Sequence, residues 1–330
     1  MNFLSRLARL FTAVGQKAPG CGSANGHGGF PPTFGQPLRE GEAEHMLVYD
    51  PATRQYGRAF RRGDPKLPPI DMARWQKARR QVMQHLLDVA TSGPWQNNLV
   101  LRGSLTMRAF AGDAAREPGD IDWVVTPETI IMSEKAAHQI IDGIIKAVSA
   151  SPRCQDAAIE PADITQTDIW TYDRAPGRRV AFPWRCGELP PAVMQMDFVF
   201  QQKLHTQPVP ITISLDTKDS VTLLSASREE SLAWKLLWLS SDIHPQGKDL
   251  YDAVLLAEGA TLPASLLKAV LQDADMLKHL SRSFPFDDRA SANVDWDNFM
   301  KECPWVEGKA SEWIQRLKTA LQPTLSELSM

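Results

Sequence analysis

The sequence has little of what marks a membrane, secreted or broadly nucleic-acid-binding protein. Its four cysteines are far apart and form no CxxC pair or Cys/His cluster, so they indicate neither a zinc site nor a disulfide framework. No apolar run approaches the length needed to cross a bilayer. With 36 Lys+Arg against 39 Asp+Glu, a chain-wide basic field is excluded as well. We therefore expect a cytoplasmic globular protein in which any nucleic-acid contact depends on a local patch.

The N-terminal segment MNFLSRLARLFTAVGQ has apolar residues at helical spacing, but Arg6 and Arg9 interrupt any signal-peptide core. We expect a short packing or partner-binding helix here, with a membrane-surface helix or a targeting remnant as alternatives. The glycine- and proline-rich stretch APGCGSANGHGGFPPTFGQP follows, and it has too few apolar residues to form regular structure. This stretch is expected to be a linker or mobile arm.

A basic stretch comes next, and its cations are Arg58, Arg61, Arg62, Lys66, Arg74, Lys77, Arg79 and Arg80. Such a cluster is either a solvated face or a surface that contacts a phosphate backbone. The aromatic residues Phe60 and Trp75 among the cations favour the second interpretation. We expect a helix from about Met72 to Ala90, capped by Asp71 and ended by Ser92-Gly93-Pro94.

The middle of the chain alternates between strand and helix patterns. NNLVLRGS, DIDWVV, AVMQMDFVF and SVTLLS are strand-like, and IWTYDRAPGRRVAFPW resembles a hairpin around Ala175-Pro176-Gly177. SEKAAHQIIDGIIKAVSA predicts an amphipathic helix capped by Ser133. After SVTLLS the hydrophobic period changes from two to about 3.6. Ser227 and Glu230 have capping-box spacing there, and helical patterns dominate from that point to the end of the chain.

These patterns predict three parts. Residues 1–45 form an N-terminal helix and Gly/Pro-rich arm, 46–225 an α/β domain and 226–330 a helical domain.

The segment DIDWVV places two aspartates in an otherwise apolar strand. Asp120 and Asp122 occupy alternate positions, so their carboxylates lie on one face, roughly 7 Å apart. Unpaired like charges in a buried strand are costly, and Mg²⁺ is the natural compensating cation, with Mn²⁺ as a second option. The seven histidines form no metal-ligand spacing.

The turn before this strand is suited to a phosphate. Gly103 allows close backbone approach, Ser104 offers a hydroxyl and a main-chain N–H, and a helix is expected to begin near Leu105. Arg108 lies one turn beyond Ser104 and either adds charge against a phosphate or is an ordinary exposed arginine. A phosphate-binding turn followed by a metal-binding carboxylate pair is typical of nucleotidyl transfer.

At this point the sequence resembles a known family. RGSLTMR, GDIDWVV, REESLAWKLLWL and GKDLYDAVLLAE, in this order, are similar to the four motifs of the AbiEii/AbiGii-type nucleotidyltransferases, a branch of the DNA polymerase β-like superfamily. The resemblance covers Leu99 to Leu256, about half of the chain. It implies a polymerase-β-like α/β core, a short mixed sheet with helices, followed by a helical C-terminal domain.

The resemblance also implies roles for individual residues. Those implied in nucleotide binding are Gly103, Ser104, Arg108, Lys235 and Lys248. Those implied in catalysis are Asp120, Asp122, Lys235 and Asp249, with Asp252 as a possible addition. Asp120 and Asp122 are the implied metal ligands, and Asp197 joins them because the superfamily often has a third carboxylate on a later strand.

Several of these residues have plainer alternatives. Lys235 has only apolar near neighbours, so it needs either an anionic partner or a route to solvent. Asp249 and Asp252 lie on one helix face and form either a second acidic cluster or an ordinary acidic helix start. Asp197 is otherwise a strand-end acid paired with Arg179 or Arg185.

Two features depart from the family pattern. The segment between Ser104 and Asp120 is long and includes AGDAAREP, which we interpret as loop variation. No arginine directly precedes Lys248, so one phosphate-contacting charge is unassigned.

The sequence thus predicts a Mg²⁺-dependent nucleotidyltransferase that moves NMP from an NTP to an acceptor hydroxyl. The resemblance favours a tRNA 3′ end as acceptor, with RNA contact through the basic stretch Arg58–Arg80. It also implies a toxin that is restrained by an antitoxin protein. The alternatives are a non-catalytic nucleotide- or RNA-binding module with the same fold, and a nucleotidyltransferase for small molecules of the antibiotic type.

Overall fold

A mixed sheet organises the chain, because the apolar alternating segments of the sequence pair with one another. The structure is a computed structural model, and it describes residues 44–50, 60–169, 175–215, 220–242, 244–277 and 294–328. The predicted N-terminal helix and most of the Gly/Pro-rich arm fall at 1–43, outside these residues. The described residues all belong to one compact unit, Pro31–Met330.

The sheet has the strand order β10-β11-β3-β4-β9-β8-β6-β5, and β7 pairs with β8. Its strands are β3 (Leu99–Arg102), β4 (Asp120–Val125), β5 (Arg153–Cys154), β6 (Ala157–Ile159), β7 (Thr165–Asp168), β8 (Gly177–Arg185), β9 (Ala192–Val199), β10 (Val209–Ser214) and β11 (Ser220–Ser225). The pairs β11–β3 and β4–β9 are parallel and the others are antiparallel. A separate hairpin joins β1 (His45–Tyr49) and β2 (Phe60–Pro65).

The helices are α2 (Pro69–Ser92), α3 (Met107–Ala111), α4 (Lys135–Ala150), α5 (Arg228–Ser241), α6 (Gly247–Gly259), α7 (Ala264–Asp273), α8 (Trp296–Glu302), α9 (Ala310–Ala320) and α10 (Gln322–Leu328). The predicted change from strands to helices falls between Ser225 and Arg228. None of the helices in the described part of the chain combines the length and apolarity required to span a membrane.

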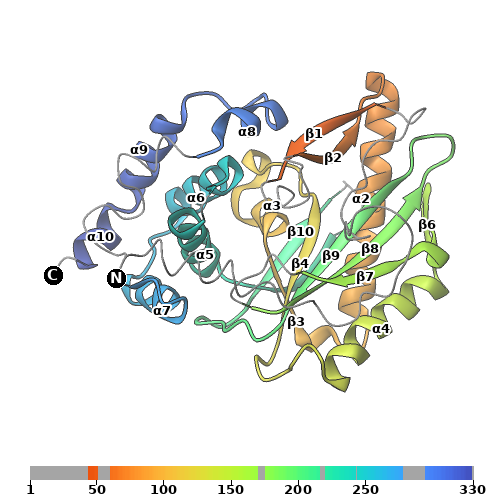
Figure 1. The fold of residues 1–330 in the computed structure, drawn as a ribbon, viewed down its shortest axis with the longest axis horizontal. Helices are drawn as coiled ribbons and strands as arrows, with labels where there is room; N and C mark the ends of the chain where they lie inside the picture. Colours follow the sequence, from red (N-terminus) through yellow and green to blue (C-terminus); the bar gives the residue numbers. More distant parts are fainter. Residues whose placement is uncertain are drawn as a thin grey trace, which may run out of the picture. The chain divides into compact units, whose positions relative to one another are not determined.

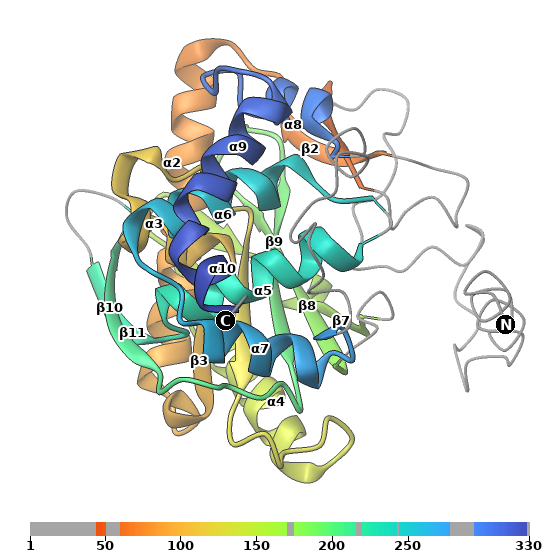
Figure 2. The ribbon, with the colours of Figure 1, turned by 90° about the vertical axis from the view of Figure 1, so that its left-hand side faces the viewer.

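Two hydrophobic cores lie on opposite faces of the sheet. Ile121, Trp123 and Val125 of β4 pack with α2 and α4, whereas Val124 packs with α5 and α6. Figure 1 shows α2 and α4 to the right of the sheet and α5 and α6 to its left, and Figure 2 looks onto the latter helices. Because strand side chains alternate, Asp120 and Asp122 share the face of Val124. The two carboxylates are thus directed towards the α5–α6 side.

The structure corrects two predicted helix caps. The helix α2 begins at Pro69, three residues before the predicted start, and Pro68 occupies its N-cap without a side-chain bond. A proline at the first helical position needs no N–H partner, which favours this start over one capped by Asp71. The N-cap of α4 is Glu134 and not Ser133, again without a side-chain bond.

Other local predictions fare better. The hairpin around Ala175-Pro176-Gly177 is confirmed as the antiparallel pair β7–β8, although 170–174 are outside the described residues. Ser227 caps α5 by accepting a bond from the Glu230 N–H at 3.1 Å. Only half of the predicted capping box forms, because the Glu230 carboxylate accepts bonds from the backbone N–H groups of His205 and Thr206 instead.

Candidate functional site

The turn after β3 brings Gly103 directly against a strand carboxylate. Gly103 has φ +79°, and a Cβ placed on it would lie 2.1 Å from Oδ2 of Asp122. A side chain here would be strained by the backbone and would also collide with the carboxylate, so the position requires glycine. The predicted helix near Leu105 is instead a 3-10 turn, Ser104–Thr106, followed by the five-residue α3. Anion binding here therefore depends on the turn itself, since so short a helix has little dipole.

The carboxylate pair lies at the edge of this turn. The Ser104 hydroxyl is buried and donates to Oδ1 of Asp120 at 3.4 Å, which places the predicted phosphate-binding and metal-binding residues side by side. Burial and then the neighbouring Asp120 raise the pKa of the Asp122 carboxyl from 3.8 to about 7, while Arg102 opposes the shift. Burial and the neighbouring carboxylate thus both act against ionisation of Asp122, and a bound cation would favour its ionised form.

Arg102 is a neighbour of this pair that the sequence interpretation did not assign to the site. It lies opposite Asp122 in the β3–β4 register and is 7% exposed. Its guanidinium carbon is 6.0 Å from the Trp234 ring and 5.8 Å from the Trp238 ring, and both rings belong to α5. Nζ of Lys235 lies 5.2 Å from the same Trp238 ring, so both cations are close to that ring.

Asp197 lies on β9, beside β4, and is opposite Asp122 in the parallel register. It is 1% exposed, and its two oxygens accept bonds of 2.7 and 2.6 Å from Arg179 of β8. The structure therefore agrees with the alternative prediction, in which Asp197 pairs with Arg179. It lies next to the metal-type pair, but both of its carboxylate oxygens already have a partner.

Lys235 has the anionic partners that its apolar neighbours require. Its Nζ donates to Oδ1 of Asp249 at 2.7 Å and lies 3.0 Å from Oδ2 of Asp252. Burial lowers the pKa of Lys235, but the two aspartates raise it more, and the net shift is upward. The helix α5 thus supplies the lysine and α6 supplies both acids, which excludes the interpretation that Lys235 extends to solvent.

Arg116 completes this cluster and was missed from the sequence. It donates to Oδ1 and Oδ2 of Asp252 at 3.2 and 2.9 Å, and the charges of Asp249 and Asp120 also act on it. Arg116 lies in the AGDAAREP segment that the sequence suggested was a loop variation. The only available signal was the missing arginine before Lys248. Spatially, Arg116 brings a guanidinium to the fourth motif from a different part of the chain.

The other two predicted nucleotide-binding residues are Arg108 and Lys248. Arg108 is partly buried and donates to Glu117 at 3.2 Å, a carboxylate that also pairs with Arg80 at 2.9 Å. Lys248 is partly exposed at the first turn of α6. Neither residue touches the carboxylate pair in the described contacts.

The carboxylate pair fits a hard divalent cation. Among the described residues, no group of three or more His, Cys, Asp or Glu side chains is arranged to hold a metal ion. Asp120 and Asp122 nevertheless offer carboxylate oxygens on one strand face, beside the Gly103–Ser104 turn. Mg²⁺ commonly takes one or two protein carboxylates and completes its shell with substrate phosphates and water. The donor set therefore suits Mg²⁺ bound together with a nucleotide.

The basic stretch is largely neutralised by the protein's own acids. The described pairs are Lys66 with Glu44, Arg74 with Asp71, Lys77 with Asp156, Arg79 with Asp64 and Arg80 with Glu117. Arg58 and the side chain of Arg61 are outside the described residues. An RNA phosphate would have to compete with these carboxylates, which weakens the stretch as a continuous RNA surface.

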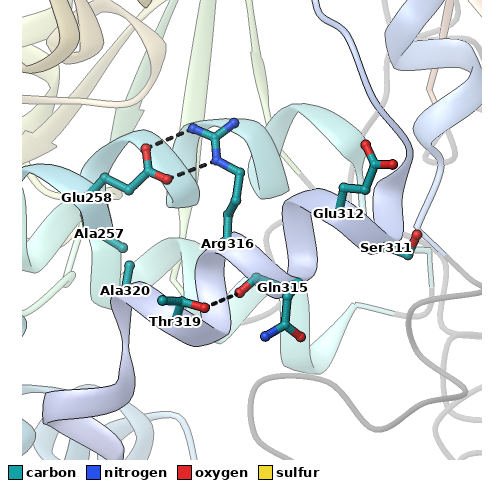
Figure 3. A pocket seen from close by; sticks show the side chains of 8 residues that line it. All are labelled: Ala257, Glu258, Ser311, Glu312, Gln315, Arg316, Thr319 and Ala320. Atoms are coloured by element: carbon teal, nitrogen blue, oxygen red, sulfur yellow. Dashed lines mark hydrogen bonds and ion pairs between the residues drawn. The ribbon is translucent and has the colours of Figure 1, made fainter.

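A separate surface hollow of about 670 Å³ lies between α6 and α9 (Figure 3). It contains none of the predicted site residues. Its main polar contact is a bidentate pair between Arg316 and Glu258.

Comparison with known proteins confirms the family resemblance. Residues 84–322, more than two thirds of the chain, match the family described as "Nucleotidyl transferase AbiEii toxin, Type IV TA system". No curated protein matches the chain. Among solved structures, MenT4, a nucleotidyltransferase toxin from Mycobacterium tuberculosis, is similar with a TM-score of 0.51 and 15% identity. The match covers 78% of this chain and 84% of that chain.

This likeness concerns the fold, and the expected α/β nucleotidyltransferase fold is confirmed by it. The chain belongs to the AbiEii family of nucleotidyltransferase toxins, which the family description assigns to type IV toxin–antitoxin systems.

Proposed function

We propose that this protein transfers NMP from a nucleoside triphosphate to the 3′ hydroxyl of an RNA, with tRNA as the acceptor and Mg²⁺ as the metal. The contact between Gly103 and Asp122 is the observation that carries the proposal. It places the turn to which we assign the phosphates directly against a metal-type carboxylate. Nucleotidyl transfer needs these two features side by side, because catalysis consists mainly of positioning and charge stabilisation.

The residues divide the work as follows. Gly103 and Ser104 hold the β and γ phosphates, and Lys235 and Lys248 add positive charge to the triphosphate. Asp249 fixes Lys235 through the 2.7 Å bond to Nζ. Asp120 and Asp122 would hold Mg²⁺, which when bound neutralises phosphate oxygens and lowers the pKa of the acceptor hydroxyl. Asp197 is a third ligand only if it shares its carboxylate with Arg179.

The transfer forms a bond between the acceptor oxygen and the α phosphorus and breaks the bond from that phosphorus to the bridging oxygen. The acceptor proton passes to one carboxylate of the Asp120–Asp122 pair, and pyrophosphate leaves. The two clusters lie on adjoining elements, since the charges of both Asp120 and Asp249 act on Arg116. A triphosphate that spans the two clusters therefore meets cations at one end and the carboxylate pair at the other.

The experiment uses the purified chain with labelled nucleoside triphosphates, Mg²⁺ and total RNA. The test variant is Asp120→Asn/Asp122→Asn, and the matched control is Asp163→Asn, an exposed acid away from the site. We expect label in tRNA-sized RNA with the wild type and the control, and none with the double variant. Periodate oxidation of the RNA 3′ end is expected to abolish labelling. Equal labelling by all three proteins, or label only in low-mass molecules, would show that the proposal is wrong.

A further inference from the structure

One face of the β1–β2 hairpin presents aromatic and apolar side chains to solvent. Leu47 is 62% exposed and Phe60 is 42% exposed. The register pairs Leu47 with Arg62 and Tyr49 with Phe60, and directly opposed residues of an antiparallel pair share a face. Tyr49 and Phe60 meet edge to face, with ring centroids 5.6 Å apart. We call these four residues the hairpin face.

A second exposed aromatic side chain follows the helix that packs against the hairpin. Trp305 is 58% exposed, and it follows α8, which packs against β1. Figures 1 and 2 both show α8 beside the hairpin. Large aromatic side chains are usually buried, so two exposed ones on neighbouring elements indicate a binding surface.

The hairpin and α8 both adjoin the candidate site. Arg79 donates to Asp64 of β2 and to the carbonyl of Pro118, two residues before Asp120. On the other side, α8 packs against the start of α6, where a Cβ on Gly247 would lie 2.6 Å from Cβ of Phe299. Asp249 follows Gly247 by two residues. The hairpin and α8 are thus each linked to one half of the site, the hairpin through Arg79 and α8 through Gly247.

We infer that the hairpin face binds the single-stranded end of the acceptor RNA by stacking bases on Phe60 and Tyr49, with Arg62 beside the backbone. This inference rests on the proposed function, which supplies an RNA acceptor. Exposed rings next to a cation are the surface that single-stranded nucleic acids use, because every base has a stacking face. The hairpin that would hold the base is linked through Arg79 to the carbonyl of Pro118, two residues before Asp120.

The size of the face favours RNA over a protein partner. Two strands about 5 Å apart, over three residues each, present on the order of 100 Å². A stable protein interface covers about 800 Å² on each partner. One or two stacked bases need only one ring each, so the hairpin face suits them.

Equilibrium binding tests the inference in the Asp120→Asn/Asp122→Asn background, where we expect no transfer. The probes are a labelled 12-nucleotide single-stranded RNA and the same strand in a blunt duplex, at one fixed salt concentration. We expect the single strand to bind more tightly than the duplex. Phe60→Ala is expected to weaken single-strand binding about tenfold, and Phe60→Trp to restore it. Val193→Ala, which alters a 50% exposed side chain on β9, is the matched control and is expected to change nothing.

The contrary outcomes are distinct. Equal single-strand affinity for Phe60→Ala and Phe60→Trp, both folded by thermal unfolding, overturns the inference, and so does the absence of single-strand binding. Loss of a protein complex with Phe60→Ala, at unchanged RNA affinity, reassigns the face to a protein partner. If the wild type labels RNA while Phe60→Ala has no effect on RNA binding, the proposed function stands and this inference falls. If single-strand binding depends on Phe60 but the wild type transfers no nucleotide, the RNA-binding role of the hairpin face stands and the proposed function is wrong.

Discussion

Arg116 and Asp252 form a bidentate ion pair across 136 positions of sequence, with donor–acceptor distances of 3.2 and 2.9 Å. The Asp252 side chain is fully buried, and that of Arg116 is 15% exposed. The charges of Asp120 and Asp249 also act on the guanidinium, so Arg116 couples the carboxylate pair of β4 to the lysine-containing cluster of α5 and α6.

Removal of this arginine is expected to destabilise the fold strongly. Among the described contacts of buried Asp252, Arg116→Met leaves Lys235 as the remaining cationic partner, and breaking a buried pair this way costs about 3–5 kcal/mol. The matched control is Arg316→Met, which removes the exposed bidentate pair with Glu258 on the α6–α9 surface (Figure 3). An exposed pair contributes about 0–1 kcal/mol. Urea unfolding of both variants checks this, and similar losses would contradict it.

Gly103→Ala is expected to abolish transfer while leaving most of the fold intact. The added Cβ would collide with Oδ2 of Asp122, and a non-glycine residue at φ +79° and ψ −157° costs roughly 1–3 kcal/mol in addition. The carboxylate has to move, which disturbs the metal-type pair. Gly112→Ala is the control, since Gly112 also has a positive φ but a Cβ there meets no atom within 4 Å. Steady-state transfer and thermal unfolding are measured for both variants. Backbone strain should lower the thermal midpoint of both, whereas the collision should abolish transfer in Gly103→Ala alone.

The carboxylate pair is expected to make stability fall with rising pH in metal-free buffer. The raised pKa of Asp122, about 7 against an ordinary 3.8, means that the folded protein holds a proton which the unfolded chain has released in this range. Stability therefore declines as pH rises from about 4 to 7. Asp122→Asn should flatten the decline, and Asp163→Asn should not. Thermal unfolding at pH 5 and pH 8 with EDTA measures it.

Mg²⁺ is expected to reverse that loss. A cation that binds the folded form alone raises its stability by mass action. The thermal midpoint of the wild type at pH 8 should rise with Mg²⁺ concentration, and that of Asp122→Asn should rise less. Equal midpoint shifts in the two proteins would show that the ion binds elsewhere.

Much of this site was predictable because its residues break local patterns. Asp120 and Asp122 interrupt an apolar strand, and Lys235 interrupts an apolar helix, so each required a partner. The motif order then named the family. A charged residue in an apolar segment and the order of motifs can both be recognised without knowing which distant segments meet in space.

The rest was not predictable, for the opposite reason. Arg116 looks like an ordinary loop cation in AAREPGD, and only the fold shows that it meets Asp252. Arg102 precedes a turn and gives no sign of its two tryptophan neighbours. The helix caps of α2 and α4 were wrong because suitable capping residues are common near helix starts, and the backbone uses whichever start the packing favours.

The two predicted lysines are expected to differ in effect. Lys235 is 6% exposed and held by two aspartates, whereas Lys248 is partly exposed and free to follow the substrate. Lys235→Met should lower kcat by about two orders of magnitude, because a preorganised charge acts mainly on the transition state. Lys248→Met should raise KM for the nucleotide more than it lowers kcat. Transfer kinetics at varied nucleotide concentration decide between these effects, and equal kcat for the two variants would contradict the assignment.

Substitution of Asp197 tests whether its carboxylate only stabilises the fold or also binds the metal. Asp197→Asn leaves Arg179 with a neutral partner in a buried position, so the thermal midpoint should fall in metal-free buffer. If Asp197 also binds the metal, the rise in midpoint on adding Mg²⁺ should shrink as well. Arg179→Met is the control: it removes the same ion pair but leaves the Asp197 carboxylate in place. A Mg²⁺ response that is weaker in Asp197→Asn than in Arg179→Met would mark Asp197 as a third ligand. Equal responses would confine its role to the ion pair with Arg179.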